Sequence, residues 1–175
     1  MKTKKQEELI NSFLSELDDE NKQIYKDIIM YLSALGYNPK KEKSNISFKH
    51  DRHNKQMIKI GMKTNKKNDS SPFLSLRFSA CKNYSQRFID VVCAYIIKYP
   101  ARTSGCINNG GCGFCAGEPH THVYTYTFPD GEIKSHCGAY AIEIPSVTKN
   151  DICEIKKLIR EEHEYLLKHE VGLLT

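Results

Sequence analysis

Apolar residues recur at helical intervals at both ends of the chain and once near its middle. In residues 6–36 they fall three and four positions apart, and an acidic cluster at 18–20 divides this segment into two predicted helices. The same spacing predicts a buried helix over 84–99 and a C-terminal helix over 149–168. Thr148 and the aspartate three residues later form a capping box, which favours a helix start at this point.

Between these helices, short segments alternate apolar and polar residues, which is typical of β-strands with one buried face. The alternating segments are 46–48, 58–62, 74–78, 122–128, 132–137 and 140–144. Pro129-Asp130-Gly131 has the composition of a tight turn and predicts a hairpin between the fourth and fifth of them. Strands bracketed by helices and joined by short links predict a single α+β domain over residues 1–175, with a largely antiparallel sheet flanked by helices.

Composition sets the class of protein. The chain has 175 residues, of which 39% are hydrophobic and 27% charged, enough to bury a core. No apolar run approaches the roughly 20 residues of a membrane-spanning helix, so we expect no membrane insertion. The first residues also lack the apolar core of a secretory signal, which favours the cytoplasm. Thiols stay reduced there, so the seven cysteines call for an explanation other than disulfides.

Three cysteines cluster in a glycine-rich loop predicted over 102–121. Residues 102–119 hold five glycines and three cysteines in the spacing C-x5-C-x2-C. The fourth cysteine of the set lies on the return strand of the predicted hairpin. If the turn centres on Asp130, Cys137 lies opposite Val123, at the open end of the hairpin and next to the loop. The predicted fold therefore brings Cys137 back beside the other three cysteines.

Four converging thiolates are typical of a structural zinc site, which closes tetrahedrally and stabilises a loop with little core of its own. The predicted zinc ligands are Cys106, Cys112, Cys115 and Cys137. Histidines near this set are candidate substitutes for one thiolate, and they are His120, His122 and His136. The remaining cysteines are interpreted differently: Cys93 and Cys153 fall on apolar helical faces and are expected in the core, and Cys81 carries no prediction.

Two other kinds of chemistry would use the same cysteines. The spacing resembles that of plant-type ferredoxins, which have four residues in the first gap where this chain has five, and the resemblance implies an iron–sulfur cluster. Alternatively, Cys112 and Cys115 form a C-x2-C pair that can cycle between thiol and disulfide. In redox proteins such a motif opens a helix, whereas the residues after Cys115 are typical of a loop.

Positive charge is concentrated in residues 40–67. Ten Lys or Arg face only Glu42 and Asp51 there, which gives this stretch a charge of +8. Such a patch attracts polyanions, so nucleic-acid binding is an alternative function, but a solvated, lysine-rich face is the favoured explanation. Within the same stretch, His50, Asp51 and His53 have the composition of a turn.

The sequence contains no paired acid, base or nucleophile beyond the cysteines. It therefore predicts a small cytoplasmic zinc-binding protein with a structural metal, acting as a non-catalytic module that binds a small molecule or a protein partner. Iron–sulfur or thiol-redox chemistry is the first alternative and polyanion binding the second. An aromatic stripe at Tyr124, Tyr126 and Phe128 is expected to line either the core or a ligand pocket.

Overall fold

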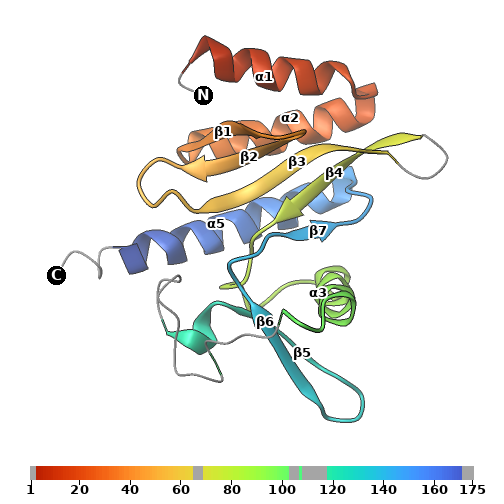
Figure 1. Ribbon diagram of the computed structural model, residues 1–175, viewed down its shortest axis with the longest axis vertical. Helices are drawn as coiled ribbons and strands as arrows, with labels where there is room; N and C mark the ends of the chain where they lie inside the picture. Colours follow the sequence, from red (N-terminus) through yellow and green to blue (C-terminus); the bar gives the residue numbers. More distant parts are fainter. Residues whose placement is uncertain (1–2, 65–68, 103–106, 108–117, 171–175) are drawn as a thin grey trace.

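The computed structural model describes residues 3–64, 69–102, 107 and 118–170 (Figure 1). Its helices are α1 (Lys4–Ser15), α2 (Asp19–Ala34), α3 (Gln86–Lys98) and α5 (Ile152–Glu170), with short 3₁₀ turns η1 (Pro119–Thr121) and η2 (Lys149–Asp151). Its strands are β1 (Tyr37–Glu42), β2 (Asn45–His50), β3 (Gln56–Thr64), β4 (Ser70–Leu76), β5 (Val123–Thr127), β6 (Ile133–Cys137) and β7 (Ile142–Ile144).

The strands form two antiparallel sheets. Five of them are ordered β1-β2-β3-β4-β7, and β5 and β6 form a separate hairpin. This confirms the predicted α+β class and the predicted antiparallel pairing. In Figure 1 the hairpin extends away from the larger sheet, with α3 beside it, while α1 and α2 lie at the opposite end of the molecule.

One strand was not predicted. β1 follows Gly36, which ends α2 with a left-handed φ of 89° that glycine adopts without strain. The strand is polar at its exposed end and contains Pro39, so it carries no alternating signal. It forms an edge of the sheet, where the missing N–H of a proline is tolerated.

The core lies between the large sheet and the helices. One face of the sheet is apolar and buried. It carries side chains that are at most 5% exposed, namely Ile46 and Phe48 of β2 and Ile58 and Ile60 of β3. α2 packs against α5 and β1, and α3 packs against β7 and the hairpin. Burial of this face supplies the main driving force for the fold.

Two helix starts confirm the predicted signals. Asp18 caps α2 by accepting a hydrogen bond from the N–H of Asn21 (2.9 Å). Thr148 and Asp151 form the predicted capping box, which opens η2 before α5. Among the described residues, no helix combines the length and the apolar character needed to cross a bilayer.

Candidate metal sites

The hairpin places Cys137 where its register predicts. Cys137 lies directly opposite Val123 and is half-buried. Its backbone N–H also donates a hydrogen bond to the carbonyl of Arg102 (3.4 Å). Arg102 immediately precedes the segment 103–117, and Val123 follows it after η1. Arg102 and Val123, which flank residues 103–122, therefore both lie beside Cys137. The three other predicted ligands, Cys106, Cys112 and Cys115, lie outside the described residues.

Two histidines at this end of the hairpin are buried, and a third is exposed. The Nε2 of His136 lies 2.7 Å from the carbonyl of Tyr99, which only accepts, so Nε2 carries the hydrogen and Nδ1 the lone pair. Nδ1 of His136 and Nε2 of His122 have no hydrogen-bond partner among the described residues. His120 is exposed.

Alternation along β6 separates His136 from the cysteine. Neighbouring residues of a strand project to opposite faces, so His136 and Cys137 do not share a face of the hairpin. His136 and Tyr124 are cross-strand partners on the face that packs against α3. His122 precedes β5, and its Nδ1 lies 3.2 Å from the hydroxyl of Tyr165, while burial lowers its pKa.

The remaining cysteines differ from their predicted positions. Cys153 is exposed and Cys93 is half-buried, so the prediction of two core cysteines is wrong. Both lie at the border of the apolar stripe of their helix, where a small shift in helix orientation exposes a side chain. Cys81 is the buried one: its thiol donates to the carbonyl of Leu158 (3.4 Å), and burial raises its pKa.

A second cluster of potential ligands lies at the far end of β2. His50 ends β2, His53 lies in the turn before β3, and His163 comes from α5. One nitrogen from each lies within 4.8 Å of the other two. The sequence predicted a turn here, which is correct for His53, whereas His50 still belongs to β2, and it did not indicate His163. Only the packing of α5 brings His163 to this turn.

A tyrosine connects the three imidazoles. Tyr37 pairs with His50 across β1 and β2, and its hydroxyl lies 3.2 Å from Nδ1 of His163 and 3.5 Å from Nε2 of His53. The rings of His50 and His53 are stacked, with centroids 4.5 Å apart. Gly36 makes room for this stack, because a Cβ there would lie 3.0 Å from Nε2 of His50.

Backbone amides fix the hydrogens of two of these rings. Nδ1 of His50 accepts from the N–H of Arg52 (3.3 Å), and Nδ1 of His53 accepts from the N–H of Lys55 (3.0 Å). Each neutral ring therefore carries its hydrogen on Nε2. A metal ion could bind these Nε2 atoms only after the hydrogens move to Nδ1 and both amide bonds are lost. Burial, followed by the neighbouring His50, lowers the pKa of His53 to about 4, so the His53 ring is neutral near pH 7.

Four lysines of the basic stretch lie on one face of the large sheet. Lys40 of β1 and Lys59 of β3 both pair with Ser47 and therefore share one face of the sheet. Lys49 and Lys63 project from the same face, but each forms an ion pair, with Glu42 and Glu143 respectively. Residues 65–68, with two more lysines, lie outside the described residues. The described part of this face is less basic than the sequence alone indicates.

No family model, curated protein or solved structure matches this chain in the three comparisons with known proteins.

Proposed function

We propose that this protein is a zinc-binding module in which Cys106, Cys112, Cys115 and Cys137 hold one structural ion. The observation that supports the proposal is the position of Cys137. Its backbone is bonded to Arg102 at the start of the cysteine-rich segment, and it is paired with Val123 beyond the end of that segment. Because Arg102 and Val123 both lie beside Cys137, the loop that would bring the other three thiolates to this cysteine is already closed at its flanks, which reduces the entropy cost of assembling the site.

Zinc would supply stability rather than chemistry at this place. Four thiolates complete a tetrahedral shell and leave no position for a substrate. The free energy of binding adds to that of folding, because the unfolded chain offers no preformed site. Residues 102–121 contain few apolar side chains with which to form a core, which makes a metal the natural source of their stability.

The histidine cluster is a second candidate metal site, favoured by the convergence of His50, His53 and His163. Imidazoles suit zinc, copper or nickel. Zinc binds nitrogen at about 2.0–2.1 Å, and one nitrogen of each ring lies within 4.8 Å of the other two. Binding through Nε2 of His50 and His53 would require both hydrogens to move to Nδ1, and the amide bonds that Nδ1 accepts in both rings oppose this. For this reason we place the zinc at the cysteines.

As to activity, we propose a binding role for a small molecule or a protein partner. Among the described cysteines, Cys81 is buried with a raised pKa, which makes it a poor nucleophile. The iron–sulfur alternative uses the same four cysteines and the thiol-redox alternative uses Cys112 and Cys115, and the metal and sulfide content of the purified protein separates both from the zinc proposal.

Cobalt substitution distinguishes the two metal sites. Co²⁺ bound to thiolates gives an intense charge-transfer band in the near ultraviolet, which a site made only of imidazoles lacks. Protein purified under reducing conditions, without chelator, would be exchanged into Co²⁺ as wild type and as Cys137→Ser, His163→Gln and Cys153→Ser. We expect the band in wild type, His163→Gln and the exposed-cysteine control Cys153→Ser, and its loss or strong reduction in Cys137→Ser. Absence of the band in wild type, or full retention in Cys137→Ser, would overturn the proposal.

A further inference from the structure

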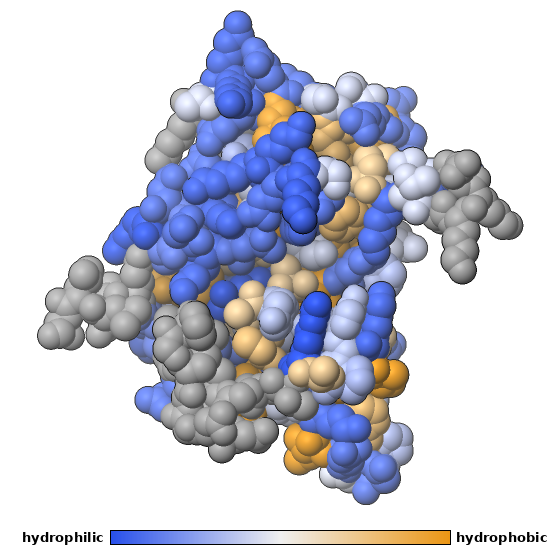
Figure 2. Space-filling view, in the orientation of Figure 1, coloured by the Kyte–Doolittle hydropathy of each residue, from blue (hydrophilic) through white to orange (hydrophobic). Residues whose placement is uncertain are grey.

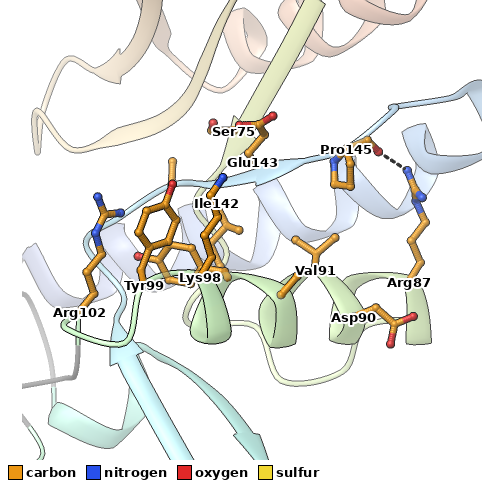
Figure 3. Close-up of a pocket in the computed structure, with 13 residues that line it drawn as sticks. Ser75, Arg87, Asp90, Val91, Lys98, Tyr99, Arg102, Ile142, Glu143 and Pro145 are labelled. Atoms are coloured by element: carbon orange, nitrogen blue, oxygen red, sulfur yellow. Dashed lines mark hydrogen bonds between the residues drawn. The ribbon is translucent and has the colours of Figure 1, made fainter. Parts of the chain in front are cut away.

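A cavity of about 620 Å³ lies between α3 and β7, and Arg102, whose carbonyl accepts from the backbone N–H of Cys137, forms part of its lining. Its volume falls in the range of about 300–1,000 Å³ that is usual for sites of small organic ligands. Its apolar lining comes from Val91 and Ala94 of α3, Ile142 of β7 and Pro145. In Figure 3, Val91 and Ile142 lie in the middle part of the cavity, between two polar ends.

One end of the cavity is cationic. Lys98, Tyr99 and Arg102 gather there, while Arg87 and Asp90 lie at the opposite end (Figure 3). The Arg102 guanidinium lies 4.2 Å from the centroid of the Tyr99 ring and 4.6 Å from that of Tyr140. Lys98 Nζ lies 5.4 Å from the Tyr99 centroid. These rings hold the two cations in place without neutralising them.

The acidic groups around the cavity are already engaged. Glu143 forms an ion pair with Lys63, and Asp90 accepts a hydrogen bond from the amide of Gln86 (2.8 Å). Arg87 is likewise committed, because it is paired with Asp151 (3.0 Å) and donates to the carbonyl of Pro145 (2.9 Å). Among the described residues, no carboxylate pairs with Lys98 or Arg102. The neutral amide of Gln86 does not cancel the charge of Asp90, so one negative charge remains at the Arg87 end of the cavity. Two positive charges, Lys98 and Arg102, remain at the other end, and the net uncompensated charge is positive.

A buried hydroxyl in the same lining has no acceptor for its hydrogen. Tyr95 is 5% exposed, and its Oη, which interacts with the Arg102 guanidinium, meets no hydrogen-bond acceptor among the described residues. Burial raises the pKa of this hydroxyl, and the neighbouring Arg102 acts in the opposite direction. A guanidinium only donates, so Arg102 cannot accept the hydroxyl hydrogen. A buried donor without an acceptor is costly, and an anionic ligand in the cavity would supply the acceptor.

We infer that the cavity between α3 and β7 binds a small organic anion with an apolar body, its acid group held by Lys98 and Arg102 and its body against Val91 and Ile142. A guanidinium already stacked on aromatic rings is preorganised to bind a carboxylate, phosphate or sulfonate with two hydrogen bonds. This inference rests on the proposed binding role and not on the zinc site, since every residue that it uses lies within the described part of the chain.

Two fluorescent probes separate the charge from the apolar body. 8-Anilinonaphthalene-1-sulfonate carries an acid group, and N-phenyl-1-naphthylamine is an uncharged molecule of nearly the same shape. Both would be titrated against the protein as purified, as wild type and as Lys98→Gln, Lys98→Gln/Arg102→Gln and Ala94→Trp. The control Lys26→Gln removes an exposed lysine of α2 outside this cavity. The zinc content of each sample is measured in parallel, so that failure at the cysteines is recognised separately.

We expect the double variant to weaken binding of the sulfonate about tenfold or more, and Lys98→Gln alone about threefold, while the amine is little affected. Ala94→Trp fills the cavity at an exposed helical position and should weaken both probes, whereas Lys26→Gln should weaken neither. Equal effects of the double variant on the two probes would overturn the role of the cations. Figure 2 shows apolar surface around the hairpin, where Ile133 is 65% exposed. Loss of sulfonate binding in Ile133→Ser, with retention in Ala94→Trp, would place the probe there and overturn the inference.

Discussion

The backbone N–H of Cys137 donates to the carbonyl of Arg102, 35 positions earlier in the chain (137 − 102). This bond joins the end of β6 to the residue before the cysteine-rich segment. With Val123 opposite Cys137 on the other side, the hairpin holds both ends of that segment together. A metal bound there would tie the segment to the hairpin, and removal of the metal would lower the stability of the folded protein.

We therefore predict that Cys137→Ser lowers the melting temperature by at least about 5 °C, because it removes one ligand of a stabilising ion. A chelator should lower the melting temperature of wild type and have little effect on the variant. Cys153→Ser, which changes an exposed thiol, is the matched control and should melt like wild type. Equal losses in the two serine variants would contradict the prediction, and differential scanning fluorimetry measures them.

A second prediction concerns thiol reactivity in the folded protein. Cys81 should resist iodoacetamide, because burial raises the pKa of its thiol and limits access to it. Cys153 is exposed and should be alkylated first. Peptide mass spectrometry at successive times resolves the two sites, and unfolding in urea should make their rates similar. Faster labelling of Cys81 than of Cys153 in the native protein would be inconsistent with the packing described.

Breaking the buried ion pair between Arg77 and Glu162 should strongly destabilise the fold. Glu162 accepts from Nε of Arg77 (2.7 Å) and from the N–H of Ala80 (2.8 Å), and both charged side chains are at most 5% exposed. Glu162→Ala should lower the free energy of unfolding by about 3–5 kcal/mol, since it removes the carboxylate that accepts from the buried guanidinium of Arg77. The double variant Arg77→Met/Glu162→Leu should lose less free energy of unfolding than Glu162→Ala does.

Urea denaturation followed by circular dichroism measures these free energies. The exposed pair of Lys4 and Glu8 provides the control, because Glu8→Gln should give no measurable change. If the Arg77→Met/Glu162→Leu double variant were less stable than Glu162→Ala, the cost would lie in packing rather than in an isolated charge.

The metal-free protein should lose stability in acid through its histidine cluster. In the folded chain the pKa of His53 is lowered to about 4, mainly by burial, while an unfolded histidine titrates near 6.5. Between these values the unfolded state binds more protons, so stability is present above about pH 6.5 and falls as the pH drops toward about 4. The pKa of His163 is lowered in the same direction.

Urea midpoints of chelator-treated protein at pH 7 and pH 5 test this dependence. His53→Asn should show a smaller drop between the two pH values than wild type does. His120→Asn removes an exposed imidazole instead and should keep the wild-type drop. An unchanged drop in His53→Asn would assign the acid sensitivity to other groups.

The hairpin could be predicted in detail because its signals are local. Alternation on both strands and the Pro-Asp-Gly turn determine the register, so the partner of Cys137 follows from counting. Gly131 has a left-handed φ of 87°, as a turn of this kind requires. Strand β1 escaped prediction because an edge strand with polar residues and Pro39 has no alternating pattern.

Features made by packing could not be predicted. His163 joins His50 and His53 only because α5 crosses the end of β2, and nothing in the spacing of these residues indicates it. The cavity beside α3 depends in the same way on how α3 lies against β7. Cys153 belongs to an amphipathic helix, but sequence periodicity does not determine the orientation of that helix finely enough to place a residue at the border of its apolar stripe.

The most direct test of the account is native mass spectrometry of the protein purified under reducing conditions without chelator, as wild type and as Cys137→Ser. The account predicts a mass increase for wild type that corresponds to one zinc ion per chain, and its loss or strong reduction in the variant. Three results would contradict the zinc proposal: no metal on the wild-type chain, a mass increase that corresponds to iron and sulfide, or full retention of zinc in Cys137→Ser.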